Sequence, residues 1–179
     1  MPSASASNEH VRRSGATYSP CGLYRYRLWR DWSGGGTLLW VMLNPSTADH
    51  LGNNDPTIER CERRARAWGY GRVEIVNLFA LKATDPKLLR AASDPVGPRN
   101  DRAILKASGA ADLILCAWGV HGRLGGRAAS VLKLLEGRTL SCLGVNRSGE
   151  PAHPLYLPYA RMPVPYSAAG SCINPGASR

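Results

Sequence analysis

Four short apolar segments alternate along the chain with segments whose apolar residues recur at helical spacing. The apolar segments are TLLWVML (37–43), RVEIVNLFA (72–80), DLILCAWG (112–119) and TLSCLGV (139–145). Each is shorter than an ordinary helix and nearly continuous in apolar character, as strands buried on both faces are. The pattern therefore predicts four central strands.

The helix expected between the first two strands has the clearest signals. Asp55 followed by Pro56 is typical of an N-cap and a first helical position. One apolar face then recurs every three or four residues, at Ile58, Cys61, Ala65 and Trp68. Gly69 is typical of a helix end. The pattern also predicts a weaker helix over about 98–108 and a stronger one over about 124–135.

An additional strand is expected before the first central one. LYRYRLWRDW (23–32) alternates apolar and polar residues and leads into the turn sequence SGGG, which predicts an antiparallel edge strand. Strands alternating with helices favour right-handed crossovers and helices on both sheet faces. The expected fold is α/β with three layers, α/β/α, around a mostly parallel four-stranded sheet plus this N-terminal antiparallel edge strand.

Length and composition are typical of one globular domain. The chain has 179 residues, of which 44% are hydrophobic. We expect flexible tails over residues 1–20 and 167–179 around a single domain at 21–166. The chain has no signal peptide and no long apolar span, so we expect no membrane contact and a cytoplasmic location. The sequence makes no prediction about oligomeric state.

The formal net charge of +10 comes mostly from arginine. Such a charge favours polyanionic partners, nucleic acid first, through phosphate contacts. An arginine-rich solvated surface explains it equally well. The charge alone therefore leaves both interpretations open.

Polar residues gather where the predicted strands end. Ligands of parallel sheets bind beyond the carboxyl ends of the strands, so residues from separate chain positions converge there. Each has an ordinary explanation alone, such as a turn, a strand end or a loop, but together they favour a functional site. The candidates are Asn44, Pro45, Ser46, Asp49, Asn77, Lys82, Trp118, Gly119, His121, His153 and Pro154.

Several common chemistries lack their motifs. The chain has no G-x-x-x-x-G-K-[ST], no G-x-G-x-x-G after a strand and no G-x-S-x-G. Its five cysteines form no C-x-x-C pair, and few carboxylates fall near the site, so we expect neither a metal nor a cofactor. Amides, imidazoles and a lysine suit recognition of a planar hydrogen-bonding group and stabilisation of a developing charge.

The stretches MLNPSTAD, DPTIERC, WGYG, VNLFALKATDP, DPVGPRND, AWGVHG and HPLYLP resemble the bacterial and phage family called domain of unknown function 1643. The resemblance extends from about Tyr24 to Pro165. It implies no function, because that family has none assigned.

The order of motifs is also similar to the uracil-DNA glycosylase superfamily. Leu43-Asn44-Pro45-Ser46 resembles the Ile-Asn-Pro-Gly motif of its mismatch-specific branch, and His153-Pro154-Leu155 resembles its closing His-Pro-Ser loop. This resemblance implies a glycosylase-like fold. It further implies that Asn44 holds the attacking water, that Asn77 reads the edge of an extruded base, and that His153 stabilises charge on the departing base.

The same resemblance implies that the Leu155–Leu157 loop wedges into a duplex whose phosphates contact Arg60, Arg63 and Arg123. Asp49 is a candidate catalytic residue beside Asn44 and His153. We therefore expect an enzyme that processes a nucleobase or nucleotide, by N-glycosidic bond hydrolysis or by DNA base modification. Its partner would be nucleic acid, DNA before RNA, or a nucleotide. The alternative is a non-catalytic module that binds nucleic acid or a modified nucleotide.

Overall fold

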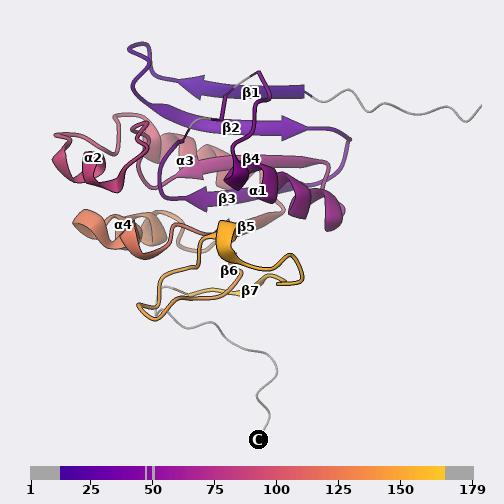
Figure 1. Cartoon of the computed structure of the whole chain (residues 1–179). Helices are drawn as coiled ribbons and strands as arrows, with labels where there is room; N and C mark the ends of the chain where they lie inside the picture. Colours follow the sequence, from indigo (N-terminus) through magenta and orange to yellow (C-terminus); the bar gives the residue numbers. More distant parts are fainter. Residues whose placement is uncertain (1–12, 47, 50, 168–179) are drawn as a thin grey trace, which may run out of the picture.

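One seven-stranded mixed sheet runs through the computed structural model, which describes residues 13–46, 48–49 and 51–167 (Figure 1). The spatial order of the strands is β1-β2-β4-β3-β5-β6-β7. The strands are β1 Arg13–Tyr18, β2 Arg25–Asp31, β3 Thr37–Met42, β4 Arg72–Asn77, β5 Leu113–Cys116, β6 Leu140–Cys142 and β7 Val164–Pro165. Strands β4, β3, β5 and β6 are parallel to one another, which confirms the predicted central strands.

The expected edge strand is an interior strand. β2 lies between β1 and β4 and is antiparallel to both. β1 occupies residues 13–18, inside the stretch expected to be a tail, and its sequence RSGATY has no apolar alternation that would have indicated a strand. The other parts of the expected tails, residues 1–12 and 168–179, lie outside the described residues. Residues 19–20 and 167 are described.

The glycine-rich turn explains why β2 pairs with β4 and not with β3. The chain crosses the start of β4, where the Trp32 amide donates to the Gly71 carbonyl at 3.0 Å and the Gly71 amide donates to Gly36 at 3.0 Å. A Cβ at Gly71 would collide with the Gly35 backbone. The absence of side chains thus lets the two backbones pass closely enough for β4 to lie between β2 and β3.

Helices cover both faces of the sheet (Figure 1). On one face, α1 (Pro56–Ala67) packs against Leu38, Trp40 and Met42 of β3. On the other, α2 (Pro86–Ala91), α3 (Asn100–Gly109) and α4 (Arg127–Leu134) pack against Leu39 and Val41. Alternate β3 side chains therefore enter opposite cores, as expected for a strand buried on both faces.

The predicted helices are confirmed with shifted ends. α1 begins at Pro56, and Asp55 caps it by accepting the Thr57 and Ile58 amides, each at 2.9 Å. The segment expected to be helical from about 124 begins instead as η1 (Val120–Gly126), because Gly125 and Gly126 have positive φ and interrupt the helix before α4. A short 3-10 helix, η2 (Pro154–Tyr156), follows His153.

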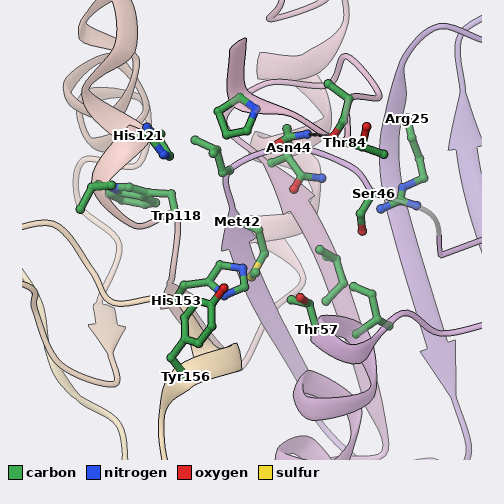
Figure 2. Close-up of a pocket in the computed structure, with 17 residues that line it drawn as sticks. Arg25, Met42, Asn44, Ser46, Thr57, Thr84, Trp118, His121, His153 and Tyr156 are labelled. Carbon is green, nitrogen blue, oxygen red and sulfur yellow. Dashed lines mark hydrogen bonds between the residues drawn. The ribbon is translucent and has the colours of Figure 1, made fainter. Parts of the chain in front are cut away.

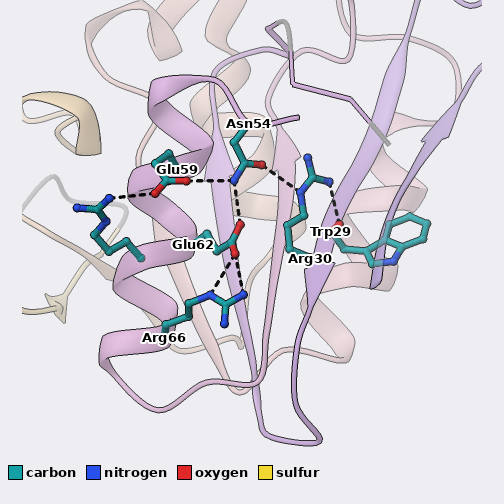
Figure 3. Close-up of polar contacts among 7 residues, drawn as sticks. Trp29, Arg30, Asn54, Glu59, Glu62 and Arg66 are labelled. Atoms are coloured by element: carbon teal, nitrogen blue, oxygen red, sulfur yellow. Dashed lines mark hydrogen bonds and ion pairs between the residues drawn. The ribbon is translucent and has the colours of Figure 1, made fainter. Parts of the chain in front are cut away.

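Polar contacts tie the loop before α1 to β2 (Figure 3). The Arg30 Nε atom donates to Asn54 Oδ1 at 3.1 Å, and Asn54 Nδ2 donates to Glu62 Oε2 at 2.8 Å. Arg30 Nη2 also donates to the Asp49 carbonyl at 2.8 Å. These bonds fix the segment that connects the end of β3 to α1. In the described part of the chain, no helix is both long and apolar enough to cross a bilayer.

Candidate functional site

A cavity of about 560 Å³ opens at the carboxyl ends of β3, β4 and β5 (Figure 2). It brings together six of the residues selected from the sequence, namely Asn44, Ser46, Asn77, Trp118, His121 and His153. These residues follow different strands of the sheet or lie at their ends. The convergence matches the position at which parallel sheets bind ligands.

Asn44 has a fixed carboxamide. Its Nδ2 atom donates to the Ala83 carbonyl at 2.6 Å and to the Pro45 carbonyl at 3.1 Å. Its Oδ1 atom accepts no hydrogen bond from any residue that the structure describes. Nearby, the Ser46 hydroxyl donates to Oδ2 of Asp55, the residue that caps α1. Asn44 therefore presents an acceptor of fixed orientation at the cavity wall.

Asn77 is the last residue of β4 and is only 3% exposed. Its backbone carbonyl accepts a hydrogen bond from Asn100 Nδ2 at 2.9 Å. Its carboxamide lines the cavity and bonds to none of the described residues. Because buried polar groups are normally hydrogen-bonded, this carboxamide is positioned for a ligand or a water molecule.

His153 immediately precedes η2, and its Nδ1 atom accepts the Leu155 amide at 3.3 Å. Burial lowers the pKa of His153, and the negative charge of Asp55 opposes this effect only in part. The ring is therefore neutral at pH 7. Since Nδ1 is an acceptor, the ring carries its proton on Nε2 and can donate it in a hydrogen bond.

Trp118 and Gly119 connect the end of β5 to the loop before His153. The Gly119 amide donates to the Pro151 carbonyl at 2.9 Å. The Trp118 indole lies edge-on to Tyr166 at 6.0 Å between ring centroids. Trp118 and His121 thus reach the cavity from the segment that follows β5 (Figure 2).

Five of the sequence candidates do not line the cavity, namely Pro45, Asp49, Lys82, Gly119 and Pro154. The Asp49 carboxylate accepts the Leu51 and Asn53 amides, at 2.9 and 3.1 Å, and so shapes its own loop. The Lys82 Nζ atom lies 5.5 Å from the centroid of the Tyr18 ring. The expected catalytic role of Asp49 and ligand-binding role of Lys82 have no contact with this cavity to support them.

The arginines expected at a phosphate backbone contact other parts of the protein. Arg60 lies 4.8 Å and Arg63 lies 5.5 Å from the centroid of the Tyr159 ring. Arg123 pairs with Glu150, with Nε 2.7 Å from Oε1. Their contact with a nucleic-acid backbone stays a prediction.

The cavity residues that were not among the sequence candidates include Arg25, Thr57 and Thr84. Arg25 stands at the start of β2, and its guanidinium reaches the cavity although the residue is only 2% exposed. Its Nη1 atom donates to the Ala48 carbonyl, and burial lowers its pKa. In the sequence, Arg25 appears only as an arginine near the start of a segment that alternates apolar and polar residues. Its position at the cavity could be inferred only once the partner strand of β2 was known.

Apolar surface makes up most of the cavity wall, and its polar groups are amides, imidazoles, hydroxyls and a guanidinium. Among the described residues, no group of three or more His, Cys, Asp or Glu side chains could hold a metal ion. Together these groups can hold a planar polar molecule and donate hydrogen bonds to an anion.

Comparison with known proteins gives one match. A family model described as "Protein of unknown function (DUF1643)" matches residues 25–155, which include all the cavity residues discussed above. No curated protein and no solved structure matches the chain. The resemblance to uracil-DNA glycosylases is not supported by these comparisons.

Proposed function

This chain belongs to the DUF1643 family, and we propose that the cavity at the carboxyl edge of its sheet binds a nucleobase and processes the nucleotide that carries it. The observation that supports this most directly is the carboxamide of the buried residue Asn77, which faces the cavity and has no hydrogen-bond partner among the described residues. A carboxamide presents an acceptor and a donor side by side in one plane, which complements the hydrogen-bonding edge of a base.

The rest of the cavity suits the same ligand. Met42, Leu43 and Ile75 provide apolar walls around the few polar groups, as in most small-molecule sites. The volume of about 560 Å³ lies within the range of about 300–1,000 Å³ typical of such pockets. A flat heterocycle can therefore be enclosed while its polar edge meets Asn77.

We infer N-glycosidic bond hydrolysis as the reaction. The bond between the sugar C1′ and the base nitrogen breaks, and its electron pair leaves with the base. The neutral His153 ring donates from Nε2 to the charge that develops on the base. Asn44 Oδ1 accepts a hydrogen bond from a water molecule whose oxygen then bonds to C1′. That water loses a proton to solvent and the base takes one up, so the products are a free base and a sugar hydroxyl.

In its most specific form, the proposal is a uracil-DNA-glycosylase-like three-layer scaffold acting on DNA. The target base would be extruded from the duplex before it enters the cavity. The net charge of +10 supports a polyanionic partner. Arg60, Arg63 and Arg123 would then contact phosphates, exchanging some of their present protein contacts for these.

One observation favours the alternative of binding without catalysis. No carboxylate of the described residues lines the cavity, so no acidic side chain there takes the proton from the attacking water. A non-catalytic module would use Asn77 and His153 only for recognition. Both alternatives use the same pocket, but only the enzyme releases a free base.

The test is release of free base. Single- and double-stranded DNA carrying uracil or modified pyrimidines, and free nucleosides and nucleotides, are incubated with the protein. Free base is measured by chromatography and abasic sites by alkali cleavage. We expect turnover that falls at least about 10²-fold in Asn44→Ala and His153→Gln, and binding that weakens in Asn77→Ala.

Asn53→Ala is the matched control, because Asn53 is exposed and lies outside the cavity. Base binding without release would establish the non-catalytic alternative. If Asn77→Ala leaves base binding unchanged, the nucleobase proposal is wrong.

A further inference from the structure

Arg25 is a buried cation that the described chain leaves largely without partners. A guanidinium has five N–H donors. In Arg25, Nη1 donates to the Ala48 carbonyl, and Nε is buried with no partner. The Nη2 atom has no hydrogen bond to a described residue and is not sealed from solvent. Burial of a charge is costly unless it is paired, so this arrangement indicates an anionic ligand.

The nearest acidic groups do not pair with this guanidinium. Tyr18, Asp55 and Asp49 interact with it electrostatically, while Arg30 repels it, and none of the described carboxylates forms an ion pair with it. The Asp55 oxygens accept the first amides of α1 and the Ser46 hydroxyl. The Asp49 oxygens accept bonds within their own loop. Both acids are therefore engaged elsewhere, and the free donors of Arg25 remain available.

Hydroxyl groups accompany Arg25 in the cavity. Thr57 at the start of α1 and Thr84 after β4 both line it, and neither hydroxyl bonds to a described residue. Figure 2 shows Arg25 beside Ser46 at one side of the cavity, with Trp118, His121 and His153 at the opposite side. The cavity thus has the Arg25 guanidinium at one side and imidazole and aromatic rings at the opposite side, and the Thr57 and Thr84 hydroxyls also lie on its walls.

We propose that the Arg25 end of the cavity binds a phosphate monoester, so that the ligand is a nucleoside monophosphate, either free or at the 5′ end of a strand. A guanidinium together with hydroxyl donors in the same cavity matches the oxygens of a phosphate. The assignment of a base to the opposite end rests on the proposed function; the anion site itself rests only on Arg25 and its surroundings.

Burial decides between a terminal and an internal phosphate. Arg25 is only 2% exposed, so a phosphate that contacts it must enter the cavity. A monoester has one ester link and can enter with its own nucleoside. An internal phosphodiester continues into chain on both sides, and both of these would have to leave a cavity of about 560 Å³ again. The site therefore selects a nucleotide with a free terminal phosphate, and within the proposed function it favours a free nucleotide or a strand end over a base extruded from inside a duplex.

The test is calorimetric titration of the full chain with defined probes. These are inorganic phosphate, nucleosides, the matching 5′-monophosphates, and trinucleotides with a 5′-phosphate or a 5′-hydroxyl. We expect at least one monophosphate to bind tenfold or more tightly than its nucleoside. This preference should be lost in Arg25→Lys, which retains the charge but lacks the planar fork.

Arg27→Lys is the matched control, since Arg27 lies on the same strand but pairs with Glu74 and does not line the cavity. Thr57→Val is the second variant and reports on the site if Arg25→Lys does not fold. We expect it to reduce the preference several-fold. Circular dichroism and the melting temperature establish which variants are folded.

Equal binding of nucleoside and monophosphate to the wild-type protein would overturn the proposal. So would an unchanged preference in folded Arg25→Lys, or in Thr57→Val if that variant alone folds. Comparable binding of the 5′-phosphorylated trinucleotide and the free monophosphate supports a strand end, and binding of the free monophosphate alone supports a free nucleotide. If phosphate binding depends on Arg25 while Asn77→Ala leaves base binding unchanged, the anion site is correct and the proposed function is wrong.

Discussion

Trp118 Nε1 donates a hydrogen bond to Glu150 Oε2 at 2.6 Å, which joins the end of β5 to the turn after β6. Both residues are buried. The other carboxylate oxygen of Glu150 accepts Arg123 Nε at 2.7 Å. One carboxylate therefore holds the indole at the cavity and the segment of η1 that carries His121.

Two substitutions of Glu150 should distinguish the stability contributed by the Trp118 hydrogen bond from that contributed by the Arg123 ion pair. Glu150→Ala leaves the buried indole N–H without an acceptor, and we expect the free energy of unfolding to fall by about 1–3 kcal/mol. Glu150→Gln keeps an acceptor for Trp118 and loses the ion pair with Arg123, whose side chain is 62% exposed. That loss should cost at most about 1 kcal/mol. Urea denaturation measures both, and equal losses would contradict the assignment.

Gly122 provides the space that Trp118 occupies. A Cβ at residue 122 would fall on Cδ1 of the Trp118 ring. We expect Gly122→Ala to displace the indole and to destabilise the protein by about 1–3 kcal/mol. Gly34→Ala is the control, because a Cβ at Gly34 would meet no atom within 4 Å. Thermal unfolding and the near-ultraviolet dichroism of tryptophan report the change, and similar behaviour of the two variants would contradict it.

His153 gives the site a defined pH dependence. Burial lowers its pKa below the usual value of about 6.5. Ligand binding that needs the neutral ring should therefore persist as the pH falls through 6.5, and weaken as it falls through the lowered pKa. The unfolded chain takes up this proton at the higher pH. The free energy of unfolding consequently decreases from about pH 6.5 down to the folded pKa and then levels off.

An NMR titration of the histidine ring protons measures this pKa directly, with His153→Gln identifying the resonance. A pKa of about 6.5 or above for His153 would contradict the prediction. It would also mean that the ring begins to lose the Leu155 hydrogen bond close to neutral pH, because a protonated Nδ1 cannot accept.

Arg64 fixes the segment that follows η2 to α1. Its side chain is buried and donates to the carbonyls of Leu157, Pro158 and Tyr159. Lysine cannot reproduce this planar set of bonds, so we expect Arg64→Lys to cost about 1–3 kcal/mol. Amide hydrogen exchange over residues 153–159 should also become faster.

Arg63→Lys is the control for this change. The Arg63 side chain is 62% exposed and pairs with the half-exposed Glu59 one helical turn away, a contact worth at most about 0.5 kcal/mol. If both lysine variants exchange at the wild-type rate, Arg64 does not hold the loop.

The sequence indicated the local elements because their signals lie within a few residues. The nearly continuous apolar character and short length of residues 37–43 identified β3, and the Asp55-Pro56 pair identified the start of α1, where Asp55 caps the helix. The polar residues that end the strands could be grouped because parallel strands share one carboxyl edge. Six of those candidates meet in the cavity.

Strand pairing required information from the whole sheet. Nothing in the sequence RSGATY signals that it covers β2, and nothing in RYRLWRD signals that β4 will be its partner. The pairing of β2 with β4 depends on the close passage of Gly71 and Gly35, which brings together residues far apart in the chain. The environment of Arg25 follows from this pairing.

The residue types, their alternation and their caps thus determined which segments form strands and helices, because propensity and burial pattern act locally. Tertiary structure decided which polar groups remain without partners. It gave Asp49 three hydrogen bonds in its own loop and placed Lys82 by an aromatic ring, while it left Asn77 and Arg25 facing the cavity. The physical reason is that the availability of a donor or acceptor depends on every group around it, and those groups come from distant parts of the sequence.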